Sequence, residues 1–130
     1  MTTVADTSVL IDHLRGDDRA YAAVRRVRSA DQRVSASVLT KVEILAGMRP
    51  SEREPTRRLL DSIEWLDVDD DLAERAGDLA ARYLRSHPGI EVVDYVIAAT
   101  VQRLGASLLT RNLKQFPMLD ALTDPYRPDP

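Results

Sequence analysis

Short strand-like stretches alternate along this chain with longer segments of helical periodicity, and this alternation constrains the fold most strongly. We predict strands at 3–6, 33–37, 64–68, 106–110 and 118–122, helices at 7–16, 18–29, 38–48, 52–63, 70–86 and 90–104, and a short turn or helix at 113–116. Alternating strands and helices are typical of an α/β fold in which helices cover a parallel sheet. We therefore expect a three-layer sandwich with a mostly parallel sheet flanked by helices.

The length of 130 residues suits one domain, which we expect to span 1–130 with a frayed, proline-rich tail from about 123 to 130. No cysteine is present, which removes disulfides, thiolate zinc sites and a cysteine nucleophile and fits a reducing cytoplasm. We see no apolar run near the roughly 18 residues that a membrane helix needs and no secretory signal, so we expect a cytoplasmic protein without a membrane partner.

Three carboxylates stand at unusual places in this pattern, and the first is Asp6, directly after the first predicted strand. Parallel sheets place their working residues at the carboxyl ends of the strands, where Thr110 and Asn112 would also lie. Asp is equally a favoured helix cap, so Asp6 has a structural explanation as well.

Asp94 lies within IEVVDYVIAA and is surrounded by apolar residues from Val92 to Ala99. An ionised side chain buried without a partner is costly, so Asp94 must cap the helix, pair with a base, titrate or bind a cation. Glu43 lies at the edge of an apolar helix face that we assign to Val38, Leu39, Val42 and Leu45, and it is also explained as an ordinary exposed glutamate.

Taken together, Asp6, Glu43 and Asp94 point to a site for a hard divalent cation, because carboxylates supply both oxygen ligands and negative charge. With only two histidines in the chain, any metal would be held by oxygen. Such an ion polarises a phosphate and lowers the pKa of a bound water, which is the chemistry of phosphodiester cleavage.

Four short motifs follow one another along the chain. They are Asp6-Thr7-Ser8 with Leu10-Ile11-Asp12, Thr40-Lys41-Val42-Glu43 with Leu45-Ala46-Gly47, Asp94-Tyr95-Val96-Ile97-Ala98-Ala99, and Leu109-Thr110-Arg111-Asn112. In this order and spacing they resemble the motifs of the PIN-domain ribonucleases, and in particular of the VapC toxins of type II toxin–antitoxin pairs. The similarity covers almost the whole chain.

The resemblance implies a PIN-domain fold and an Mg²⁺- or Mn²⁺-dependent endoribonuclease that cuts tRNA or rRNA. Asp6, Glu43 and Asp94 would be the catalytic, metal-binding carboxylates. Supporting positions would be Ser8, Thr40, Thr110, Asn112 and Gln115. Arg111 and Lys114 are our candidates for contacts with RNA phosphates. The resemblance also implies a homodimer that a VapB-type antitoxin holds inactive in a heterotetramer or larger assembly.

The chain departs from the family pattern at Gln115, where many relatives carry an acid shortly after the TRN motif. Asp12, Asp120 or Asp124 are the open substitutes for that fourth carboxylate. We hypothesise one firmly bound metal ion, with any second ion arriving with the substrate.

A phosphoryl-accepting receiver domain and a haloacid-dehalogenase-type phosphatase both fit poorly, because Asp6 lacks the neighbouring acids that those sites need. The missing fourth acid motivates the better alternative, a catalytically weak PIN-like module that binds RNA or an antitoxin without cleavage.

Overall fold

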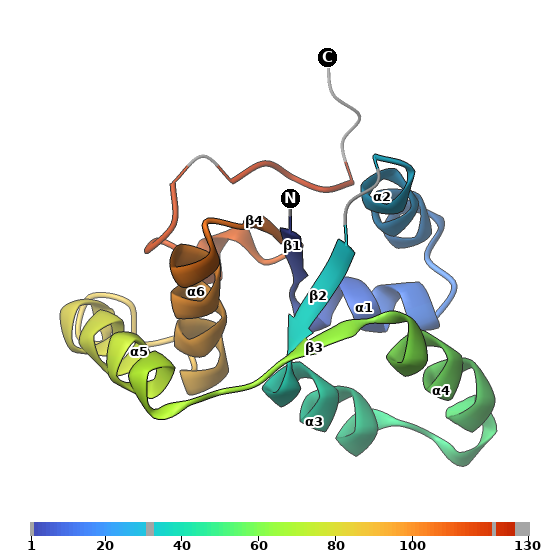
Figure 1. The fold of residues 1–130 in the computed structure, drawn as a ribbon, viewed down its shortest axis with the longest axis horizontal. Helices are drawn as coiled ribbons and strands as arrows, with labels where there is room; N and C mark the ends of the chain where they lie inside the picture. Colours follow the sequence, from blue (N-terminus) through green and yellow to red (C-terminus); the bar gives the residue numbers. More distant parts are fainter. Residues whose placement is uncertain (1, 31–32, 121, 127–130) are drawn as a thin grey trace.

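Four short strands form one all-parallel sheet in the computed structural model, which describes residues 2–30, 33–120 and 122–126 (Figure 1). The strands are β1 (Thr2–Ala5), β2 (Arg33–Ser37), β3 (Glu64–Leu66) and β4 (Ser107–Leu109). Their order across the sheet is β3-β2-β1-β4, so β1 lies inside and pairs with β2 and β4. The predicted parallel sheet is therefore confirmed.

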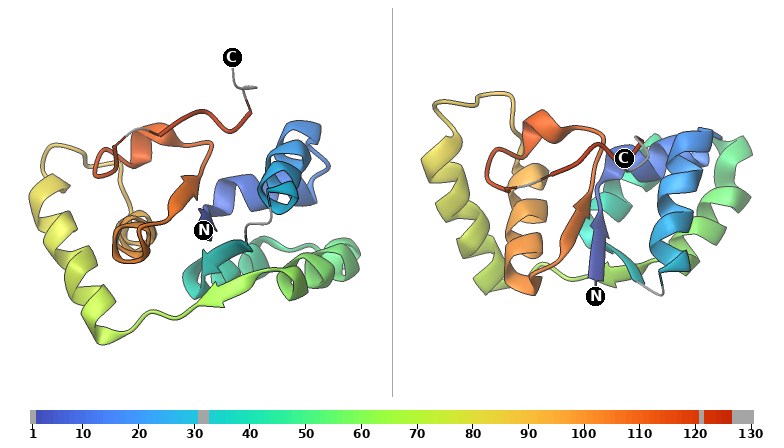
Figure 2. Two further views of the ribbon diagram at one scale, coloured as in Figure 1. Left: turned by 45° about the horizontal axis from the view of Figure 1, so that its top comes forward. Right: turned by 90° about the horizontal axis from the view of Figure 1, so that it is seen from above.

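Helices cover both faces of this sheet (Figure 2). They are α1 (Thr7–Leu14), α2 (Asp18–Ser29), α3 (Val38–Gly47), α4 (Arg53–Ser62), α5 (Asp70–Tyr83) and α6 (Val92–Leu104), with single 3₁₀ turns η1 (Pro50–Glu52) and η2 (Leu113–Gln115). In the right panel of Figure 2, α5 and α6 lie on one side of the strands and α1, α2 and α4 on the other. None of the helices in the described part of the chain is long and apolar enough to cross a membrane.

Local signals in the sequence explain where these helices begin and end. The Asp17 carboxylate caps α2 and accepts the backbone N–H groups of Arg19 and Ala20, at 2.9 and 3.3 Å. Asp69 caps α5 in the same way, at 2.8 Å from the N–H of Leu72. Gly105 ends α6 in the left-handed conformation (φ 59°), which favours glycine.

Two apolar clusters fill the space between the layers. One lies against α5 and α6 and includes Val4, Leu72 and Ile97. The other lies against α1, α2 and α4 and includes Ala5 and Val24. Val4 and Ala5 are consecutive residues of β1, and they point to opposite faces because side chains alternate along a strand. The central strand is therefore fixed from both sides, and so is the residue that follows it.

The structure corrects two of the sequence predictions. Residues 118–120 form a turn and bend, and Leu122 has no regular structure, so the strand predicted at 118–122 is wrong for these residues; residue 121 lies outside the described part. The buried face of α3 is also different. Val42 and Leu45 are exposed, whereas Thr40 and Ile44 are buried.

The predicted frayed tail, 123–130, lies partly outside the described residues, because 127–130 are not described. Within 122–126, Tyr126 packs beside the cluster under α1 and α2, and its hydroxyl donates a 2.6 Å hydrogen bond to Asp12 Oδ2. This part of the tail is held against the domain.

Candidate active site

The carboxyl ends of β1 and β4 place Asp6 beside Thr110. Leu109 pairs with Ala5 in the sheet, and the backbone N–H of Asp6 donates to the carbonyl of Leu109 at 2.9 Å. The Thr110 hydroxyl donates to Asp6 Oδ2 at 2.8 Å, and both side chains are buried. Asp6 Oδ1 also accepts the backbone N–H of Thr7 at 2.8 Å and so caps α1. The capping role of Asp6 and its place at the sheet edge are therefore both present.

Further predicted supports converge on the same carboxylate. The Ser8 hydroxyl donates to Asp6 Oδ2 at 3.1 Å and accepts the backbone N–H of Arg111 at 3.3 Å. The backbone N–H of Asn112 donates to the Thr110 hydroxyl at 3.0 Å. Segment 110–112 is thus tied through two hydroxyl groups to Asp6, which fixes the orientation of that carboxylate.

Glu43 is brought to the same place from α3 by a pair of threonines. The Thr7 hydroxyl donates to Glu43 Oε1 at 2.6 Å and lies 3.1 Å from the hydroxyl of Thr40. A hydroxyl has one hydrogen, so when Thr7 donates to Glu43, Thr40 donates to Thr7. Thr40 is fully buried. A polar residue on the buried face of α3 therefore serves to position Glu43.

Asp94 lies in the first turn of α6, where its Oδ2 accepts the backbone N–H of Glu91 at 3.0 Å. Burial above all, together with the negative charges of Asp6, Glu91 and Glu43, raises the pKa of the Asp94 carboxyl to about 6, although the backbone hydrogen bond from Glu91 acts in the opposite direction. The backbone hydrogen bond alone does not compensate this charge. Asp94 thus both caps its helix and titrates abnormally.

These side chains share an open cleft of about 390 Å³. It is lined by Asp6, Thr7, Ser8, Ile11, Asp12, Arg15, Glu43, Glu91, Asp94, Arg111, Asn112 and Gln115. Five carboxylates thus face the cleft with two guanidinium groups. The donor set is oxygen, as a hard cation prefers, and the raised pKa of Asp94 marks negative charge that a cation would relieve. In the described part of the chain, no three acidic or histidine side chains are already close enough to one another to hold a metal ion, so an ion would bind only after a change of side-chain rotamers in the cleft.

The predicted residues differ in how closely they approach this cleft. Gln115 lines it, as expected for the position of the missing acid, but Lys114 is exposed and is not part of its wall. Of the possible substitutes, Asp12 lines the cleft, whereas Asp120 lines a separate cavity. Asp124 accepts the backbone N–H of Tyr126 at 2.9 Å.

Sequence reasoning missed one cleft carboxylate, Glu91. It precedes α6 as the N-cap residue, three positions before Asp94. The signal was available in the spacing of two acids at the start of an apolar helix, which is typical of reciprocal capping. Glu91 brings a negative charge to the cleft, whereas Gln115 is neutral.

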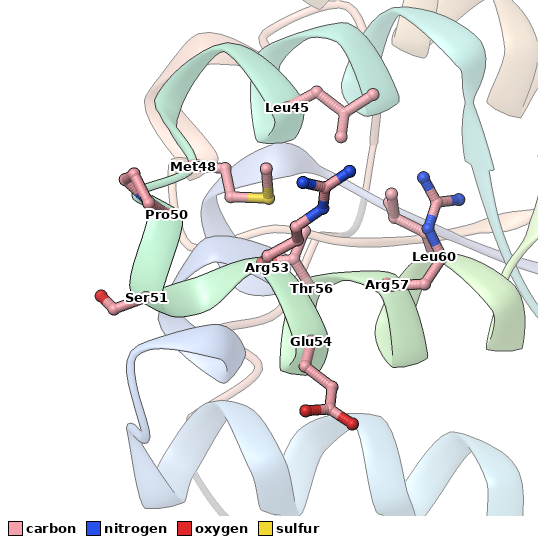
Figure 3. Close-up of a pocket in the computed structure, with 9 residues that line it drawn as sticks. All are labelled: Leu45, Met48, Pro50, Ser51, Arg53, Glu54, Thr56, Arg57 and Leu60. Carbon is pink, nitrogen blue, oxygen red and sulfur yellow. The ribbon is translucent and has the colours of Figure 1, made fainter.

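A larger cavity, of about 710 Å³, lies between the end of α3 and α4 (Figure 3). Leu45, Met48 and Leu60 contribute apolar surface, and Arg53 and Arg57 extend from the same side of α4. No group of facing acids is found in its lining, so this cavity lacks the chemistry that the acidic cleft offers.

Comparison with known proteins identifies the family of this chain. Residues 3–121 match the PIN domain family. The chain belongs to this family. It is 40% identical to Ribonuclease VapC19 of Mycobacterium tuberculosis over 121 residues, which cover 93% of this chain and 97% of that protein. It is 39% identical to Ribonuclease VapC10 of the same organism over 123 residues, which cover 95% of this chain and 92% of that one.

The fold of the PIN-domain chain is also found in a solved toxin–antitoxin complex from Klebsiella pneumoniae. The superposition has a TM-score of 0.78 at 26% identity and covers 95% of this chain and 98% of the other. The resemblance to PIN-domain VapC proteins, made above from four short motifs, is therefore confirmed.

Proposed function

We propose that this PIN-domain protein is a metal-dependent endoribonuclease and the toxin of a VapBC-type toxin–antitoxin pair. The observation that carries the proposal is the position of Asp94, whose partly buried carboxyl has a raised pKa and faces the negative charges of Asp6 and Glu43 in one cleft. The two VapC relatives named as ribonucleases support hydrolysis of RNA as the activity.

In this proposal Asp6, Glu43 and Asp94 hold Mg²⁺ or Mn²⁺. The bound ion would polarise the scissile phosphate and lower the pKa of a water molecule. Glu91 and Gln115 are near enough to line the same cleft and would complete its wall, one with charge and one with a neutral carbonyl.

In this proposal, neighbouring hydroxyl groups orient the metal-binding carboxylates by hydrogen bonds. Thr110 and Ser8 hold Asp6 by hydrogen bonds to one of its oxygens, so that carboxylate keeps its orientation when substrate arrives. Thr7, backed by Thr40, holds Glu43. Fixed ligands lower the reorganisation that an ion and a phosphate would otherwise require.

In this proposal Arg111 contacts the RNA backbone at the cleft, and Lys114, outside the cleft, contacts it more weakly. Arg111 lines the acidic cleft and half of its side chain is exposed, so its guanidinium is available to a phosphate. Asn112 also lines the cleft and offers an amide to the ribose or phosphate oxygens. The target, tRNA or rRNA in the cytoplasm, is part of the proposal.

The proposed partners are an antitoxin of the VapB type and a second copy of this chain. The similarity to a chain of the Klebsiella pneumoniae toxin–antitoxin complex supports the antitoxin. The exposed apolar residues Val42 and Leu45 on α3 are consistent with a surface that a protein partner covers.

The proposal is tested by incubating a mixed tRNA and rRNA pool with purified, antitoxin-free protein in Mg²⁺, in Mn²⁺ and in EDTA. Discrete fragments are expected with either metal and none with EDTA. Asp94→Asn is expected to abolish cleavage, and Asp78→Asn, at an exposed position of α5, is the matched control that is expected to leave it unchanged.

One observation favours the alternative of a binding module without cleavage, namely that Gln115 lines the cleft where an acid is expected. Binding of RNA or an antitoxin without fragments in any metal would support that alternative. In that event Gln115→Asp is expected to restore cleavage.

A further inference from the structure

The segment 122–126 crosses from the side of α6 to the side of α2 (Figure 1). There Tyr126 donates its hydroxyl hydrogen to Asp12 Oδ2 at 2.6 Å. Asp12 is a member of the cleft wall, and only 14% of its side chain is exposed. The segment, called the strap below, therefore contacts the cleft wall at the partly buried carboxylate of Asp12.

Asp12 in turn holds the guanidinium of Arg111. The Nη1 atom of Arg111 lies 3.2 Å from Asp12 Oδ1 and 3.1 Å from Oδ2. Among the described residues, the other two guanidinium nitrogens, Nε and Nη2, make no hydrogen bond, and 51% of the Arg111 side chain is exposed. One edge of the guanidinium is thus fixed, and the rest is available to a ligand.

The main chain of Arg111 is fixed as well, because its N–H donates to the Ser8 hydroxyl, which donates to Asp6. Arg111 is therefore restrained at its backbone by the group that orients Asp6 and at its tip by Asp12 and Tyr126. An arginine restrained at both ends differs from a typical surface arginine, whose side chain must lose conformational freedom when it binds.

Several contacts keep the strap in place. The guanidinium of Arg19 lies 5.0 Å from the centre of the Tyr126 ring, and Asp124 accepts the Tyr126 N–H. Arg26 donates to the carbonyl of Pro125. Burial and the hydrogen bond to Asp12 raise the pKa of Tyr126 above its usual value, so its hydroxyl remains a donor at any pH at which the protein is used.

We propose that Tyr126 and Asp12 are positioning residues, which hold the guanidinium of Arg111 at the cleft rim so that its free edge binds a phosphate of the RNA. The inference rests on the proposed function, because it assigns a role within RNA binding. Holding the arginine in advance removes the cost of ordering it when RNA binds. The opposite effect is also testable: if Asp12 merely neutralises Arg111, releasing the pair would strengthen RNA binding.

The test measures the affinity for fluorescently labelled unfractionated tRNA by anisotropy, with Ca²⁺ in place of Mg²⁺. The full chain is compared with Tyr126→Phe, Arg111→Ala and the double variant. Tyr83→Phe, on α5 away from the cleft, is the matched control. Thermal unfolding of each variant reports whether it folds.

Tyr126→Phe is expected to weaken binding by about two- to tenfold, the range for ordering one long side chain. Arg111→Ala is expected to weaken it by about tenfold or more, and to lower the slope of log affinity against log salt by about 0.7 to 1. The double variant is expected to match Arg111→Ala alone, because Tyr126 acts through Arg111. Tyr83→Phe is expected to have no effect.

The inference would be overturned if Tyr126→Phe bound the RNA with unchanged or higher affinity. It would also be overturned if the loss of affinity in the double variant were the product of the losses in the two single variants. Cleavage of the same tRNA in Mg²⁺ is scored separately. Absence of cleavage by the unmodified chain would contradict the proposed nuclease, while the binding measurements would still decide the role of the strap. Absence of RNA binding would overturn both.

Discussion

Asp94→Asn should stabilise the metal-free protein while it removes the proposed activity. The pKa of Asp94 is raised from 3.8 to about 6, so ionising this carboxyl in the folded state costs free energy. A shift of this size corresponds to about 3 kcal/mol for a fully shielded group, and because Asp94 is only partly buried we reduce this to about 1 to 1.5 kcal/mol. The asparagine keeps an oxygen that accepts the Glu91 N–H and carries no charge.

The sign of the pH dependence follows from linkage. Between about pH 4 and pH 6 the folded state binds more protons at Asp94 than the unfolded state, so the free energy of unfolding of the unmodified protein falls as pH rises through this window. The increase in the free energy of unfolding that Asp94→Asn causes is therefore expected to be largest at pH 7.5, smaller at pH 5 and absent near pH 4.

Urea unfolding in EDTA at pH 5.0 and pH 7.5 measures these differences, with Asp78→Asn as the control for removing an exposed carboxyl. Repeating the experiment with Mn²⁺ at 100 times its dissociation constant should stabilise the unmodified protein by about 2.7 kcal/mol and Asp94→Asn by much less. An Asp94→Asn protein that is less stable than the unmodified one in EDTA at pH 7.5, or a stability difference that does not change with pH, would refute the reasoning.

Three further variants test the supports of the cleft. Thr110→Val keeps the shape of the side chain but removes the donor to the buried Asp6 carboxylate, and urea unfolding should show a loss of about 1 to 3 kcal/mol; no loss would mean that this hydrogen bond does not support Asp6. Thr7→Val releases Glu43 and should lower kcat for RNA cleavage about tenfold or more, with unchanged kcat as the contrary result. Gln115→Asp adds a carboxylate to the cleft and should tighten Mn²⁺ binding about tenfold in a calorimetric titration, whereas equal or weaker binding would show that position 115 does not face the ion.

Most of the fold was predictable from local sequence signals. The strand at 33–37 and the helix at 18–29 have their predicted bounds, because an aspartate cap and clear periodicity mark them. The sequence also predicted that Asp6 and Thr110 lie at the carboxyl ends of their strands. Asp6 and Thr110 meet there because parallel neighbouring strands end side by side.

The errors have a common physical cause, which is long-range contact. The buried face of α3 was predicted from hydrophobicity alone. Thr40 is nevertheless buried, where its hydroxyl lies beside the Thr7 hydroxyl that holds Glu43, and Val42 is exposed to solvent. The strand predicted after Pro117 is a turn at 118–120, where Phe116 and Met118 fill one cluster of the core instead of pairing with a neighbouring strand.

The contact between Tyr126 and Asp12 joins residues 114 positions apart. Nothing in the local sequence signals such a contact. The presence of Glu91 in the cleft wall likewise depends on long-range packing, because α6 contacts β1.

We propose that the acidic cleft binds a divalent cation through Asp6, Glu43 and Asp94. Calorimetric titration of the antitoxin-free protein with Mn²⁺ at pH 7.5 tests it most directly, beside Asp6→Asn and the Asp78→Asn control. We predict one tightly bound ion per chain, lost in Asp6→Asn and retained in Asp78→Asn. No binding, two tight ions, or binding that survives Asp6→Asn unchanged would contradict the account.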